Sequence, residues 1–271
     1  AVVERVGRKA IEAYVDTVAG RALLERPVEP GRIVAASRQE LAGITEWTLS
    51  NGARVVLKPT FHQQDDVVFR ATSPGGHSLA SDADFVSAMT AAQVISPAVT
   101  GLGHLSAVDL RKVLAGKIAS VTPFIDETEE GLTGSASTQD IETLFQLVYL
   151  TFTAPRADAA AFAAHVAQGK AILANRQASP AFAFAEALEA VLSQDHPRAR
   201  PLTVELLDRM NMEKSLALYK HRFADAGDFT FVFVGSFDVE SMRPLVERYL
   251  ASLPALSRKE TWKDVGIGPP T

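Results

Sequence analysis

The sequence predicts an α+β fold in which helices cover one face of a largely antiparallel sheet, with a helical arm at the N-terminus. Three observations support this prediction. A hairpin-type pair of strands surrounds Asn51-Gly52, strand-like segments recur up to about residue 137, and long segments with helical periodicity follow between residues 139 and 193. Because strands and helices come in groups, a parallel doubly wound fold is disfavoured.

Composition limits the possible functions. The chain has 271 residues, of which 47% are hydrophobic and 22% charged, enough to bury a core in one large domain. Its formal net charge is −5 and it has no dense Lys/Arg block, which argues against a nucleic-acid partner. It has no cysteine, which excludes disulfides, thiolate metal sites and cysteine nucleophiles. No run approaches the roughly 18–20 consecutive apolar residues of a membrane span.

The first part of the chain predicts a helix and a linker. Residues 2–20 carry apolar side chains at three- to five-residue intervals, and Pro27, Pro30 and Gly31 then interrupt the pattern. We therefore expect an arm over residues 1–44 and a single domain over 45–271. The chain opens without methionine inside a helix-like segment, so we expect a processed chain or a piece of a longer one.

The next segments predict strands and short helices. ITEWTLS and ARVVLKPT flank Asn51-Gly52, which favours a tight hairpin turn, and residues 67–72 form another alternating strand. Ser81 and Asp84 have the spacing of a capping box, in which Asp84 would bond the start of a helix that ends before Pro97. Ser106 and Asp109 repeat this spacing before a short helix.

The remaining elements follow from the same rules. We expect strands over residues 117–125 and 132–137 around an acidic turn, and a buried strand over 229–234. Helices are expected over residues 139–152, 158–177, 180–193, 203–209, 213–224 and 238–252.

Few residues suggest chemistry by themselves. None of the six histidines lies three to five residues from another, so there is no local zinc motif. The acidic run 126–130 lacks the alternating ligands and central glycine of a calcium loop, which indicates a solvated turn. Arg198 and Arg200 could bind a carboxylate or peptide carbonyl of a substrate. The alternative for these two arginines is a rigid exposed loop before a helix.

Several segments together resemble one domain of the pitrilysin/insulinase family of zinc metallopeptidases, which includes the mitochondrial processing peptidases. The resemblance covers roughly residues 45–255 and rests on LSNGARVVLKPT, SPGG, ADFVSAM, HPRARPLTVELLDRM and the stretch from LALYKHRF to ASLP. The likeness is greatest to the long bacterial periplasmic members, in which one chain holds four related domains.

The family's catalytic residues are missing from the matching positions. Active domains carry H-x-x-E-H on the helix that aligns with residues 83–89. Asp84 and Ala88 stand where the two zinc imidazoles would be, and Ser87 stands where the general base would be. A third ligand, a glutamate, would fall at about residues 165–177, but no Asp or Glu occurs from 159 to 185. Catalytic zinc requires three protein ligands, so we expect neither a catalytic residue nor a metal site in this segment.

The resemblance implies a non-catalytic domain of a larger zinc metalloendopeptidase, with the zinc held by another domain of the parent protein. Such a domain would form chamber wall, contact other domains of the same polypeptide and could hold peptide substrate by strand addition. A periplasmic location is implied by the resemblance alone. The alternative is a stand-alone structural or assembly subunit derived from the same fold. A third possibility is an enzyme whose site is not recognised from the sequence.

Overall fold

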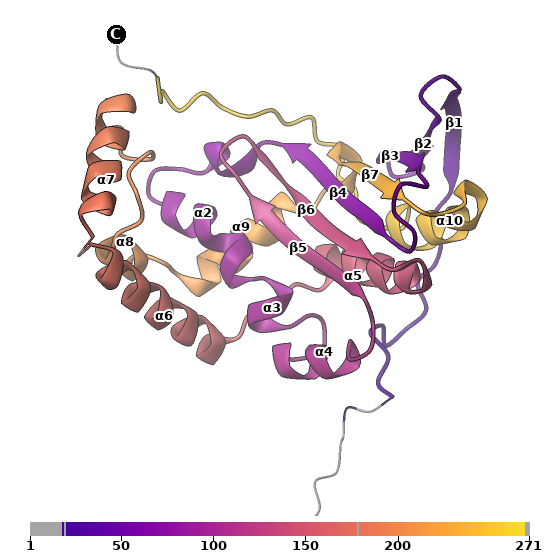
Figure 1. Ribbon diagram of the computed structural model, residues 1–271, viewed down its shortest axis with the longest axis horizontal. Coiled ribbons are helices and arrows are strands. Elements are labelled where there is room, and N and C mark those ends of the chain that lie inside the picture. Colours follow the sequence, from indigo (N-terminus) through magenta and orange to yellow (C-terminus); the bar gives the residue numbers. More distant parts are fainter. Residues whose placement is uncertain (1–17, 19, 178, 269–271) are drawn as a thin grey trace, which may run out of the picture.

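A seven-stranded sheet in the order β1-β2-β3-β7-β4-β6-β5 forms the centre of the computed structural model (Figure 1). The structure describes residues 18, 20–177 and 179–268. The strands are β1 (Ile33–Gln39), β2 (Ile44–Leu49), β3 (Arg54–Pro59), β4 (Val67–Pro74), β5 (Ala119–Ile125), β6 (Glu129–Ala136) and β7 (Thr230–Gly235). Strands β3 and β7 pair in parallel and the other neighbours pair antiparallel, which confirms the predicted largely antiparallel sheet.

Helices follow the strands in two groups. The first comprises η1 (Gly76–Leu79), α2 (Phe85–Val94), α3 (Pro97–Thr100) and α4 (Ala107–Val113). The second comprises η2 (Thr138–Asp140), α5 (Ile141–Thr153), α6 (Ala159–Gln177), α7 (Pro180–Leu192), α8 (Val204–Asp208), α9 (Met212–Arg222), η3 (Ala226–Asp228), α10 (Val239–Leu245) and the π-helical turn η4 (Val246–Leu250). Within the part of the chain that the structure describes, no helix is both long and apolar enough to cross a membrane.

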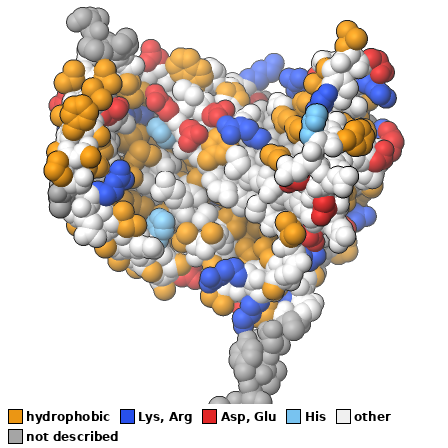
Figure 2. Space-filling model, in the orientation of Figure 1, with side chains coloured by type: hydrophobic (Ala, Val, Ile, Leu, Met, Phe, Trp, Pro, Cys, Tyr) orange, Lys and Arg blue, Asp and Glu red, His pale blue; other side chains and the backbone are white. Residues whose placement is uncertain are grey.

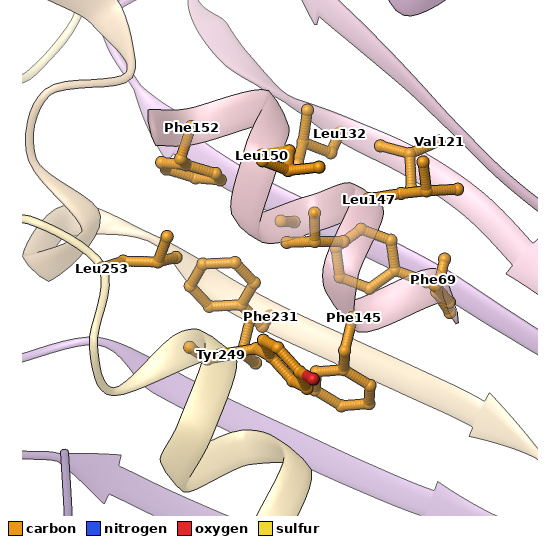
Figure 3. Close-up of a cluster of buried hydrophobic side chains, with 14 of the residues drawn as sticks. Phe69, Val121, Leu132, Phe145, Leu147, Leu150, Phe152, Phe231, Tyr249 and Leu253 are labelled. Atoms are coloured by element: carbon orange, nitrogen blue, oxygen red, sulfur yellow. The ribbon is translucent and has the colours of Figure 1, made fainter. Parts of the chain in front are cut away.

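One face of the sheet is buried and the other is open. Along β4, Phe69 and Ala71 are buried while Val68 and Arg70, which alternate with them, are exposed. From the helix layer, Phe145 of α5 stacks on Phe233 of β7, with ring centroids 5.0 Å apart. Figure 3 shows the buried side chains of the sheet, of α5 and of η4, called the C-terminal helical turn below, meeting in this layer. The predicted arrangement, with helices on one face, is confirmed.

The hairpin β2–β3 forms where Asn51-Gly52 predicts it. Gly52 adopts a φ of 91°, which a glycine accommodates without strain. The Asn51 side-chain amide donates to the carbonyls of Leu250 and Leu253, at 2.8 and 3.1 Å. The turn therefore also fixes the end of the C-terminal helical turn against the sheet.

Several boundaries differ from the sequence prediction. Residues 33–39, predicted as linker, form β1 and pair with β2 by backbone hydrogen bonds. The side chains of β1 are exposed after Ile33, so the segment has no alternating pattern to reveal it. The helix predicted over 238–252 is divided between α10 and η4. The helix predicted over 2–20 falls almost wholly outside the described residues.

The last described residues, 254–268, form no helix or strand and are called the C-terminal segment below. In Figure 1 this segment runs as an extended strip along the upper edge of the view. Its course brings it against η1 and α9, as its hydrogen bonds show.

Candidate functional site

Helix α2 begins directly after Asp84, which the sequence predicts as the first of the degenerate zinc-motif positions. The Asp84 carboxylate accepts hydrogen bonds from Lys214 Nζ at 2.7 Å and Ser81 Oγ at 2.9 Å, and these donors hold the pKa of Asp84 below its ordinary value. The prediction that Asp84 bonds the helix start is wrong. Asp84 itself occupies the cap position, and its side chain makes no bond to the helix N–H groups because it is directed to Ser81 and α9.

Ser87 and Ala88, the other two degenerate positions, are buried, each with 3% of its surface exposed. The Ser87 carbonyl accepts a hydrogen bond from Ser215 Oγ at 3.1 Å, which ties α2 to α9. The Ala88 methyl group borders a cavity and offers no lone pair to a metal. Among residues 18, 20–177 and 179–268, no three His, Asp or Glu side chains converge in a way that could hold a metal ion.

The stretch predicted to contain the third ligand position lies at a different cavity. His165, Val166 and Gly169 of α6 line a space of about 160 Å³ together with Thr90 and Gln93 of α2. Asp84 and Ala88 do not border this space. An acidic residue introduced at these α6 positions would therefore face the later turns of α2.

Asp84 and Ala88 instead border a cavity of about 450 Å³ between η1, α2, the end of β5 and α9. One part of its wall is apolar and comes from Leu79, Ala88, Ile125 and Leu218. Another part is polar and comes from His77, Ser81, Asp84, His221, Arg222 and Glu260. An apolar wall with a few polar groups is the usual composition of a small binding site.

A buried ion pair lies behind the polar wall. The side chains of Arg222 and Glu130 are 6% and 1% exposed, and Arg222 Nη1 lies 3.6 Å from Glu130 Oε1. Gly76 N–H donates to Glu130 Oε2 at 2.5 Å. On its other side, Arg222 Nη2 donates to Glu260 Oε2 of the C-terminal segment at 2.6 Å. Arg222 therefore joins a buried carboxylate of the sheet to a carboxylate at the cavity wall.

The position of Glu130 corrects the prediction of a solvated acidic turn. Asp126 and Glu127 precede β6, but Glu129 begins the strand and Glu130 pairs with Ser73 of β4 in the sheet. Burial raises the pKa of Glu130 to about 7, although Arg222 and the Gly76 N–H act in the opposite direction. The cluster was misjudged because strand alternation, which turns Glu130 inward, extends farther toward the turn than expected.

The two histidines at the cavity are held in their neutral form. Burial, followed by the charge of Arg198, lowers the pKa of His77 to about 4. Burial and the charges of Arg222 and Arg258 also lower the pKa of His221. His77 Nδ1 is buried and has no hydrogen-bond partner. At neutral pH the cationic group of this wall is thus Arg222.

Glu130→Gln tests the buried carboxyl group. The pKa of Glu130 is raised from 4.5 to about 7, so the folded state favours the neutral form and wild-type stability falls as pH rises from about 4.5 to 7. Glutamine mimics the neutral form, so at pH 8 the variant should unfold at higher urea, with a gain of up to about 3 kcal/mol. At pH 4.5 the two proteins should be nearly equal. An equal difference at both pH values would contradict the assignment.

The predicted substrate-binding candidates Arg198 and Arg200 lie outside this cavity wall. Arg198 is 9% exposed and donates to Asp82 Oδ1 at 2.6 Å and to the Ala80 carbonyl at 2.8 Å. Arg200 forms a two-bond pair with Asp195, at 3.0 and 2.7 Å. Both guanidinium groups are thus engaged within the domain, and a role in substrate binding stays a prediction.

Sequence analysis missed Arg222 and Glu260, and it placed Glu130 in a solvated turn. One local signal was available for Arg222. Ser215, Tyr219 and Arg222 recur at helical spacing and share the buried side of α9, so an arginine on an otherwise buried face indicated a buried partner. The partner, Glu130, lies 92 positions earlier in the sequence and could not be found from a local pattern. Glu260 follows the last predicted helix and has no pattern around it.

The mostly antiparallel sheet with helices on one face defines an α+β domain of the metallopeptidase-like type. A zinc protease PQQL-like protein of Arabidopsis thaliana is 28% identical over 233 residues, which are 85% of this chain and 21% of that protein. A probable zinc protease PqqL of Haemophilus influenzae is 23% identical over 231 residues, 84% of this chain and 24% of that protein. No protein-family model matches the chain.

Solved structures show the same fold. The periplasmic protease PqqL of Escherichia coli superposes with a TM-score of 0.77 and 23% identity, over 96% of this chain and 28% of that one. A peptidase M16 inactive domain from Pseudomonas fluorescens gives a TM-score of 0.63 and 16% identity, over 81% of this chain and 54% of that one. These similarities support the resemblance of the chain to the pitrilysin/insulinase family. It spans about a quarter of the length of the zinc proteases that it matches.

Proposed function

We propose that this chain acts as a non-catalytic domain of a larger zinc metalloendopeptidase, whose zinc is held by another domain. The start of α2 carries the proposal. The positions of the two zinc ligands and the general base hold Asp84, Ala88 and Ser87, and Asp84 and Ser87 contribute contacts within the domain itself. The similarity to the inactive M16 domain and the short span on the zinc proteases support this role.

The proposal includes contacts with other domains of the same polypeptide, and α7 offers a surface for them. No residue of α7 is buried, and Phe184, Leu188 and Val191 are 70%, 46% and 65% exposed. Figure 2 shows hydrophobic side chains gathered at the upper left, where Figure 1 places α7. A 13-residue helix is marginal alone in water, and contiguous apolar patches are typical of interaction sites.

The proposal also includes a contribution to the chamber wall and to peptide binding by strand addition. Among the described residues, the sheet ends at β1 on one side and β5 on the other, and no further strand pairs with the outer edges of these two strands. Pro123 lies within β5 and has no N–H to donate, whereas β1 lacks proline. We therefore assign peptide addition to the edge of β1. A periplasmic location follows the description of the Escherichia coli relative as a periplasmic protease.

A zinc-binding measurement on the chain alone tests the proposal that this domain has no catalytic zinc site. We expect zinc titration by calorimetry to show no stoichiometric tight binding, and a peptide library incubated with chain and zinc to show no cleavage. The variant Asp84→His/Ala88→His is the matched control, because two imidazoles at i and i+4 on one helix restore a weak zinc site. Cleavage by the unmodified chain that a chelator abolishes would overturn the proposal.

The coding sequence tests the larger architecture. We expect an H-x-x-E-H helix encoded in the same reading frame, and peptidase activity of the full-length product that is lost when the glutamate of that motif is changed to glutamine. A short independent gene would instead favour the stand-alone structural or assembly subunit.

A further inference from the structure

The C-terminal segment lies against the domain in the manner of a bound peptide. Within this segment Arg258 and Glu260 are partly buried, whereas Lys259 between them is exposed. Over these three residues the chain is placed as a locally extended peptide with one side on a surface. The segment thus presents Arg258 and Glu260 to α9 and the loop that follows it.

Polar contacts fix the segment at both ends of this stretch. Arg258 N–H donates to Asp225 Oδ2 at 2.6 Å, and Arg258 Nη2 donates to the His221 carbonyl at 2.7 Å. Farther along, Lys263 N–H donates to Ser78 Oγ of η1 at 3.0 Å. Between these anchors, the carboxylate of Glu260 pairs with Arg222.

Arg222 is built to receive a carboxylate at the cavity. It is almost fully buried, and its Nη1 has no hydrogen-bond partner although Glu130 lies 3.6 Å away. A buried guanidinium keeps its charge and prefers a carboxylate partner with two-bond geometry. His77 Nδ1, on the same wall, is a second buried polar atom without a partner. Nη2 is the Arg222 atom that meets a carboxylate at the cavity, as it does with Glu260.

Glu260 leaves much of the cavity unfilled. The carboxylate lies at the wall, and about 450 Å³ remains beside it, bordered by Leu79, Ala88, Ile125 and Leu218. A ligand that places a carboxylate on Arg222 and an apolar side chain in this space gains burial that the segment does not have.

We propose that this cavity is a binding site for an extended peptide with an acidic side chain, and that Glu260 occupies its carboxylate position as a tethered competitor. The inference goes beyond the proposed function, since it requires neither zinc nor a parent peptidase. Because the competitor is part of the same chain, it acts at an effective concentration in the millimolar range. An incoming peptide must displace it, so the full chain should bind such peptides weakly until Glu260 is removed.

Binding of a synthetic peptide to the full chain tests the proposal. The probe is the peptide SRKETWKD, residues 257–264, with a fluorescent label, and binding is followed by anisotropy. We expect Glu260→Ala to bind at least ~10-fold more tightly than the unmodified chain, as the competing carboxylate is gone. The same peptide with glutamine in place of glutamate should lose this gain, which tests Arg222 without altering the protein.

Two controls separate this site from general effects. Glu240→Ala removes a matched exposed glutamate that pairs with Arg243, and it should leave binding unchanged. A series of probe peptides with leucine moved along each side of the glutamate should contain at least one tighter ligand, whose advantage disappears in Ala88→Met. Equal binding by the unmodified chain and Glu260→Ala, or equal binding of the glutamate and glutamine peptides, would overturn the proposal. Absence of zinc-dependent activity would leave it unaffected.

Discussion

Arg222→Met should destabilise the chain by about 2–4 kcal/mol at pH 8, because it takes the cation away from Glu130 and Glu260 and forces the buried Glu130 carboxyl group to take up a proton. Methionine fills a similar volume, so the effect reports the lost charge more than a cavity. Glu130 has a 1% exposed side chain, which means that water cannot replace the guanidinium. Urea denaturation at pH 8, followed by circular dichroism, measures the change.

The pH dependence distinguishes this cause from a general packing defect. The pKa of Glu130 is already raised to about 7, and removing Arg222 raises it further. A raised carboxyl pKa means that stability is retained at low pH and is lost as pH rises through that value. The loss of unfolding free energy in Arg222→Met should therefore be smaller at pH 5 than at pH 8. At pH 8, the loss caused by Arg222→Met should also be smaller when Glu130→Gln is already present.

Arg243→Met is the matched control for Arg222→Met. The Arg243 side chain is 39% exposed, and its guanidinium group pairs with Glu240 and lies 5.0 Å from the centre of the Trp47 ring. Exposed pairs of this kind contribute about 1 kcal/mol or less. A loss in Arg222→Met that equals that of Arg243→Met, or that is the same at pH 5 and 8, would contradict the buried pair as its cause.

Phe231→Ala should destabilise the domain by about 3–5 kcal/mol, through lost burial and the cavity that remains. Phe231 lies in β7, is fully buried, and its ring lies 5.9 Å from that of Phe152 and 6.3 Å from that of Phe69. Figure 3 shows it among side chains from α5 and the C-terminal helical turn. Because β7 is the central strand, its loss of packing affects both halves of the sheet.

Val234→Ala on the same strand provides the comparison for Phe231→Ala. Val234 is 37% exposed on the open face of the sheet, so its truncation should cost less than about 1 kcal/mol. Urea midpoints of the two variants at one pH give the difference. A change in Phe231→Ala as small as that in Val234→Ala would show that the central strand is not packed as described.

Local patterns predicted much of the fold because they reflect local physical rules. Asn51-Gly52 specified a turn, and Ser106 caps α4 as its spacing predicts, with Asp109 N–H donating to Ser106 Oγ at 3.1 Å. Strand β1 was not predicted because its pairing uses backbone groups, which every residue has. The capping role of Asp84 failed because Lys214, from a distant part of the chain, offered its carboxylate a charged partner.

The candidate site was likewise only partly predictable from the sequence. The prediction that Asp84, Ser87 and Ala88 occupy zinc-motif positions, and the absence of acidic residues from 159 to 185, came from the sequence because metal ligands require particular chemical groups. The cavity and the ion pair of Arg222 with Glu130 were not visible. Their components come from β6, η1, α9 and the C-terminal segment, and nothing in one segment specifies which distant side chain will meet it.

The sequence by itself determined the turns, most helices and the buried strands, and it predicted that the zinc-binding groups are missing, since each depends on residue type over a few positions. Only the tertiary structure decided which charges are buried together and which surface the C-terminal segment covers. Those outcomes depend on strand order and helix packing, which bring together groups more than a hundred positions apart, such as Ser78 and Lys263.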